Sequence, residues 1–163
     1  MTQPSLRPQD VFVLAKLISY RGPRPPMARM GVDLSLSASE VHGALKRLAI
    51  SRLVSDEADG GRPLLQPVEE FLLHGVKYAF PAKRGEPTRG LATSYAAPPL
   101  ASRIASGTEL PPVWPYADGN QRGIGLEPLY KTVPIAALRD PLLYELLALI
   151  DAIAQRAPDS PAA

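Results

Sequence analysis

Cysteine is absent from the 163-residue chain, which excludes disulfide bonds, a thiol nucleophile and thiolate metal ligands together. Histidine occurs only twice, and no serine stands beside a base in a recognisable nucleophile motif. No apolar run approaches the roughly 18 residues that span a membrane, and no basic leader precedes an apolar stretch. We therefore expect a soluble cytoplasmic protein that is not an enzyme and holds no metal and no cofactor.

Net charge is also small, because 18 Lys and Arg oppose 16 Asp and Glu and leave +2. The charges are distributed unevenly along the chain. Residues 1–90 carry 13 basic and 9 acidic side chains, whereas residues 91–163 carry 5 and 7. The basic surplus therefore lies in the first half, which is where we expect a polyanionic partner to bind.

Long regular periodicity is missing from the middle of the chain. Nine of the 19 prolines lie between Pro81 and Pro134, and this stretch has no sustained period of 2 or 3.6. It does contain one tryptophan and several tyrosines, which a disordered linker would usually lack. We expect residues 81–139 to form an ordered but irregular proline-rich segment that packs on the domain before it.

Helical spacing of apolar residues is present in the first half. It predicts a first helix from Pro8 to Ser19 and a short second helix opened by Pro26. A tight turn at residues 34–36 follows. These elements lead directly into the most informative stretch of the sequence.

That stretch is SLSASEVHGALKRL, residues 35–48. Ser37 and Glu40 have the spacing of a capping box, so we expect a third helix from about Ala38 to about Arg52. Val41 begins an apolar stripe at i, i+3, i+4 and i+7, which leaves the opposite side small, polar and basic. The residues expected on this outer side are Ser39, His42, Gly43, Lys46 and Arg47.

Beyond this helix, LVSDEADGGRPLLQPV reads as strand, turn and strand around the Gly60-Gly61 pair. Pro63 and Pro67 limit the returning strand to a short edge strand. A further helix is expected over about Val68 to Tyr78. Its His74 is better explained as a packed or half-exposed side chain than as a ligand.

Helix, helix, tight turn, helix and glycine-containing hairpin, in this order, resemble the winged helix-turn-helix transcriptional regulators, with the multiple-antibiotic-resistance regulator (MarR) family the nearest group. The resemblance covers roughly residues 6–80 and rests on MARMGVDLSLSASEVHGALKRLAISRLVSDEADGGRPLL. It implies a mainly α (α+β) fold with a DNA-binding domain at residues 1–80. In such domains the third helix enters the major groove and the hairpin forms the wing.

The DNA-binding residues expected on this basis are Ser37, Ser39, His42, Gly43, Lys46, Arg47 and, at the wing, Arg62. Each also has a plainer interpretation. His42 is equally a surface histidine, Lys46 and Arg47 are contacts to phosphate alone, and Arg62 is a solubilising charge on a hairpin.

A second candidate surface lies in VWPYADGNQRGIGLEPLY, which mixes aromatic and polar residues of the kind found at binding hot spots. The partner-binding candidates are Trp114, Tyr116, Asn120 and Arg122. The same aromatic residues equally well serve to pin an irregular segment onto its neighbour.

The C-terminal helix is expected at residues 140–156, before a frayed tail at 157–163. Asp140 is its N-cap and Pro141 its first residue. Apolar residues occupy more than half of its circumference, so it needs two neighbours, and we expect one of them to be a second copy of the chain. The dimer candidates are Leu142, Leu146, Leu149, Ile150 and Ile153.

These features together favour a sequence-specific DNA-binding transcriptional regulator, a repressor or autoregulator. It would act as a homodimer on a pseudo-palindromic site in double-stranded DNA. The alternative hypothesis is an antitoxin-like protein that binds the product of a neighbouring gene through its second half.

Overall fold

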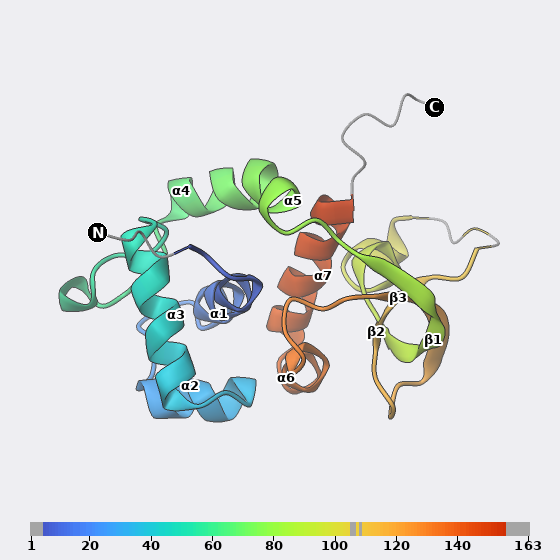
Figure 1. Ribbon diagram of the computed structural model, residues 1–163, viewed down its shortest axis with the longest axis horizontal. Helices are drawn as coiled ribbons and strands as arrows, with labels where there is room; N and C mark the ends of the chain where they lie inside the picture. The colour runs from blue at the N-terminus through green and yellow to red at the C-terminus, as the bar shows by residue number, and fades with distance from the viewer. Residues whose placement is uncertain (1–4, 105–106, 108, 156–163) are drawn as a thin grey trace. The chain divides into compact units, whose positions relative to one another are not determined.

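Residues 5–104, 107 and 109–155 are described by the computed structural model shown in Figure 1. Helices and a small sheet are combined, in agreement with the expected α+β class. The chain divides into two compact units, and each unit is built from two separate stretches of sequence. Unit 1 is Met1–Glu69 with Pro128–Leu147, and unit 2 is Glu70–Glu127 with Ala148–Ala163. The units therefore cut across the boundaries expected at residues 80 and 139.

Unit 1 begins with α1 (Pro8–Ser19), α2 (Met27–Leu34) and α3 (Ala38–Ile50), as the sequence predicts. Every residue of α1 from Asp10 to Leu17 is buried, so this helix is the centre of the core. Both α2 and α3 turn their apolar stripes inward, and Met30, Leu34, Val41 and Leu48 are fully covered.

The turn between α2 and α3 is tight because two backbones meet there. Leu36 N donates to Gly31 O over 2.8 Å, and a Cβ on Gly31 would lie 2.5 Å from Leu36 O. Ser35 reverses the chain in the left-handed region with φ 55°. The expected capping box then opens α3, since Glu40 N donates to Ser37 Oγ over 3.0 Å and Ser37 N donates to Glu40 Oε1 over 3.1 Å. Gly31 is thus required by the close approach of its neighbour.

The expected hairpin after α3 is reduced to residues 53–64, which we call the 53–64 loop. A single antiparallel bridge joins Val54 and Pro63, and Leu64 N donates to Leu53 O over 2.9 Å. Gly60 and Gly61 have φ 90° and 58° and close the turn. No returning strand extends to Leu65, because that residue already begins the next helix.

That helix also starts earlier than expected. It comprises α4 (Leu65–Glu70), a π-helical turn (Phe71–Gly75) and α5 (Val76–Ala79), which together replace the helix predicted over 68–78. His74 is exposed on the π-helical turn.

The second stretch of unit 1 contains α6 (Val133–Arg139) and the first half of α7 (Pro141–Gln155). Asp140 caps α7 as predicted, because its Oδ1 accepts from the backbone N of Leu142 and Leu143 over 3.1 and 3.2 Å. Its Oδ2 accepts from Lys16 Nζ over 2.8 Å and joins the start of α7 to α1. Leu143 and Leu147 complete the core from this side.

Unit 2 corrects the expectation of an irregular segment. Strands β1 (Arg84–Ala92), β2 (Pro112–Pro115) and β3 (Gln121–Leu126) form a closed sheet in which each strand pairs with both others. A Cβ on Gly90 would overlap the carbonyl oxygen of Trp114, and one on Gly123 would overlap that of Pro111. The sheet therefore closes through backbone contacts that glycine alone permits. Its strands lack the alternation of apolar residues that would predict them from the sequence.

The core of unit 2 contains a buried carboxylate. Asp151, on the second half of α7, is 6% exposed, and its Oδ2 accepts hydrogen bonds from Thr93 Oγ1 over 2.7 Å and Trp114 Nε1 over 2.8 Å. Burial raises the pKa of Asp151 to about 6, although both hydrogen bonds act in the opposite direction. The protonated form is therefore favoured by folding.

This carboxylate should make the stability of unit 2 depend on pH. Because the pKa of Asp151 is raised by folding, its contribution is fully present below about pH 4 and is lost as the pH rises through about 6. The free energy of unfolding should fall by up to about 3 kcal/mol over that range. Urea unfolding followed by the fluorescence of Trp114, the single tryptophan, measures it. Asp151→Asn should remove this dependence and the exposed Asp118→Asn should retain it; equal pH profiles for the two variants would contradict the assignment.

Candidate nucleic-acid interface

The outward side of α3 brings together several of the residues expected to bind DNA. Ser39, His42 and Lys46 are exposed, and Gly43 is half-buried between them. Ile50 continues this side one turn further and is 49% exposed. Sequence reasoning missed Ile50, although its position four residues after Lys46 and eight after His42 places it on the same side of a helix.

Helix α3 itself contributes no carboxylate to this side, because its one acidic residue is directed elsewhere. Glu40 Oε2 accepts from Gln9 Nε2 over 2.8 Å and from Tyr130 OH over 3.1 Å. The hydrogen bond from Ser37 N and the bond from Gln9 lower the pKa of Glu40 despite partial desolvation. Its negative charge is thus held against α1 and the segment before α6. Ser37 is exposed, and its hydroxyl is occupied as the N-cap acceptor.

Arg47 is not on the outward side, and the prediction that placed it there is wrong. Its Nε and Nη2 donate to the two carboxylate oxygens of Asp10, each over 2.8 Å. The Asp10 side chain is fully buried and that of Arg47 is 15% exposed. The hydrogen bond to Asp10 also raises the pKa of Arg47. Arg47 therefore holds α3 against α1.

Arg62 is exposed, but its surroundings are acidic. Its Nε lies 3.4 Å from the carbonyl oxygen of Asp59, and its backbone N donates to Ser55 Oγ over 2.9 Å. Asp56, Glu57 and Asp59 are exposed on the same loop. Three carboxylates beside one guanidinium oppose entry of this loop into a DNA groove, because phosphates line that groove.

A cavity of about 420 Å³ lies between α3 and the 53–64 loop. Its lining includes the apolar residues Leu45, Ile50 and Val54 and the charged residues Lys46, Asp56 and Glu57. This cavity therefore separates the outward side of α3 from the 53–64 loop.

The partner-binding candidates of unit 2 are separated by the structure. Trp114 is 1% exposed and bonded to Asp151, so it belongs to the core and cannot anchor a partner. Tyr116 is half-buried, and Asn120 and Arg122 are exposed. The sequence allows Trp114 to be either a packing residue or a binding hot spot, and its burial shows that it is a packing residue.

The dimer candidates on α7 are also covered to different degrees. Ile150 is 4% exposed within unit 2, which corrects its placement on a surface between copies. The remaining candidates, Leu142, Leu146, Leu149 and Ile153, are half-buried. The wide apolar face of α7 is thus largely packed by its own chain.

Comparisons with protein-family models, with curated proteins and with solved structures found no match to this chain. In the part of the chain that the structure describes, no group of His, Asp and Glu is arranged to hold a metal ion. None of the helices described is long and apolar enough to cross a membrane.

The ion pair of Arg47 yields a stability test. Arg47→Ala should lower the free energy of unfolding by about 3 to 5 kcal/mol, because it leaves the buried Asp10 without its partner. Lys46→Ala, one residue away and exposed, should change it by less than about 0.5 kcal/mol. Urea unfolding of both variants measures the difference; a loss of similar size in each would show that the ion pair does not support the core.

Proposed function

We propose that this protein is a sequence-specific DNA-binding transcriptional regulator whose α3 enters the major groove. The observation that carries the proposal is the outward side of α3, where Ser39, His42 and Lys46 are exposed on one side of the helix and the helix's own carboxylate, Glu40, is held by Gln9 and Tyr130. The order α1, α2, tight turn, α3 and 53–64 loop supports the proposal, because winged helix-turn-helix domains have helices, tight turn and wing in the same order.

Each exposed group on this side has a defined role in the proposal. Ser39 and His42 hydrogen-bond base edges, and Lys46 binds a guanine or a phosphate. Gly43 is given no role in base contact, because the guanidinium of Arg47 lies over it, with Nη1 3.3 Å from where a Cβ would stand. Ile50, which is exposed, offers an apolar contact of the kind that reads the thymine methyl group.

The acidic 53–64 loop shapes the proposal as well. Because Asp56, Glu57 and Asp59 repel phosphate, we assign base reading to α3 alone and give the loop no part in the minor groove. Repression then follows from occupation of a promoter.

Two parts of the hypothesis stay predictions. A homodimer would place two α3 helices about 34 Å apart on a pseudo-palindromic site, but Leu143, Leu147 and Ile150 of α7 are already buried in the single chain. The alternative hypothesis, an antitoxin-like protein that binds a neighbouring gene product, is weakened because Trp114 is buried and cannot anchor that partner. Regulation of transcription is therefore the function that the geometry favours.

DNA binding should be specific and sensitive to salt. In a fluorescence-anisotropy titration, the protein should bind a duplex from upstream of its own gene more tightly than a random duplex. The logarithm of affinity should fall with the logarithm of salt concentration, with a slope of about −0.9 per neutralised phosphate. Equal affinity for both duplexes at low salt would refute the regulator hypothesis.

Removal of one charge from α3 should weaken this binding without unfolding the protein. Lys46→Ala should reduce the magnitude of the salt slope by about 1, because one ammonium contact is lost. Lys131→Ala is the matched control, since Lys131 is an exposed lysine on the segment before α6. Its affinity and slope should equal those of the wild type. The same loss in both variants would indicate a general charge effect and would remove α3 from the interface.

A further inference from the structure

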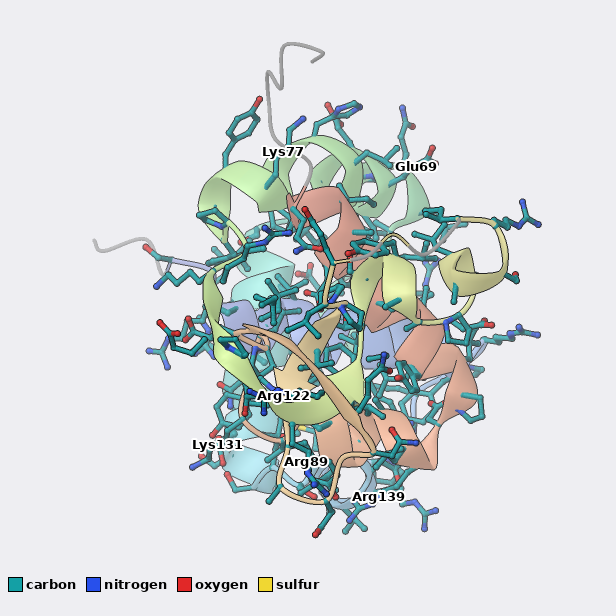
Figure 2. All side chains as sticks on the ribbon, turned by 90° about the vertical axis from the view of Figure 1, so that its right-hand side faces the viewer. Glu69, Lys77, Arg89, Arg122, Lys131 and Arg139 are labelled. Atoms are coloured by element: carbon teal, nitrogen blue, oxygen red, sulfur yellow. The ribbon has the colours of Figure 1, made fainter. Side chains whose placement is uncertain are left out.

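Two arginines lie directly opposite each other on neighbouring strands of the sheet of unit 2. Arg89 on β1 and Arg122 on β3 are direct partners in the antiparallel register, and both are exposed. Directly opposed residues of an antiparallel pair point to the same face, with Cβ atoms about 5 Å apart. Figure 2 labels both side chains on these neighbouring strands. The sheet thus presents two guanidinium groups together.

This arrangement opposes folding, because like charges directly opposite each other destabilise a strand pair. Among the described residues, neither guanidinium has a hydrogen bond or an ion pair with a protein group. Lys83, beside the start of β1, does have such a partner, since its Nζ lies 4.0 Å from Glu127 Oε2 just after β3. The Arg89–Arg122 pair therefore lacks the internal compensation that is present nearby.

A ligand of this sheet is expected to bind its side chains and not to pair with its backbone as an additional strand. Each strand pairs with both others, and Pro87 removes a donor from the exposed first half of β1. Addition of a partner strand is therefore disfavoured.

The chemistry of two adjacent guanidinium groups favours a phosphate backbone over an acidic side chain. One carboxylate is satisfied by a single arginine in a bidentate pair and does not account for the second. Successive phosphates of a DNA strand are about 3.4 Å apart along the helix axis. This spacing allows two arginines that start about 5 Å apart to contact one phosphate each.

We propose that Arg89 and Arg122 bind the phosphate backbone of duplex DNA and give unit 2 its own contact, independent of sequence. The assignment rests on the DNA-binding function proposed above. It adds a site that contributes affinity and no base reading, since phosphate contacts position a protein without specifying sequence.

Reversing one charge tests the proposal in the full chain. Arg122→Glu should raise the midpoint of thermal unfolding, because it converts a repulsive cross-strand pair into an attractive one. It should also weaken binding to the upstream and random duplexes by the same factor and reduce the magnitude of the salt slope by about 2, since the introduced carboxylate also engages Arg89. Arg103→Glu makes the same change in net charge at an exposed position outside the sheet and should have neither effect. Identical salt slopes in the two variants would overturn the proposal.

Resonances of the arginine side chains separate this proposal from the function of α3. During titration with a short random duplex at low salt, the Nε–H signals of Arg89 and Arg122 should shift and saturate. Such shifts without preference for the upstream duplex would refute specific regulation and retain the phosphate site. Preference for the upstream duplex without these shifts would refute the phosphate site and retain specific regulation. Larger shifts with a decaglutamate peptide than with duplex would overturn the phosphate assignment in favour of an acidic partner.

Discussion

Helix α1 is buried from Asp10 to Leu17 although it carries a carboxylate and an ammonium group, so the core of unit 1 depends on pairing both charges. Asp10 is matched by Arg47 of α3, and Lys16 is matched by Asp140 at the start of α7. Burial opposes the charge of Asp140, but the hydrogen bond from Lys16 and that from Leu143 N keep its pKa lowered. An isolated buried charge is strongly destabilising, whereas a paired and hydrogen-bonded one is tolerated. The two pairs therefore fix which helices surround α1.

These pairs also change what the charge distribution means. The basic surplus of residues 1–90 indicates a polyanion-binding surface, but Lys16 and Arg47 are both engaged by carboxylates within unit 1. Three of the acids of the same stretch are exposed together on the 53–64 loop. The surface potential near α3 thus depends on a few side chains, with Lys46 foremost, and much less on the composition of the half in which they lie.

How far the sequence predicts this protein depends on the range over which each signal acts. The capping box of Ser37 and Glu40, the start of α1 at Pro8 and the cap at Asp140 are local, and the structure confirms all three. The partner of Arg47 lies 37 residues away, so helical spacing alone placed the side chain wrongly. The sheet was not predicted for the same reason, since its contacts join residues that are far apart in the sequence. Its closure depends on Gly90 and Gly123 meeting distant backbone atoms, while its prolines argue against strands.

The discontinuity of unit 1 has a consequence for the order of folding during synthesis. Domains generally fold as units, N-terminal parts first, as the chain leaves the ribosome. Here the three N-terminal helices emerge with Lys16 unpaired, and its partner Asp140 is made only after the whole sheet of unit 2. Leu143 and Leu147, which are buried in the folded protein, are made only after the same sheet. The core around α1 is thus completed only after the sheet of unit 2 has been synthesised, and α1 stays exposed to misassociation until then.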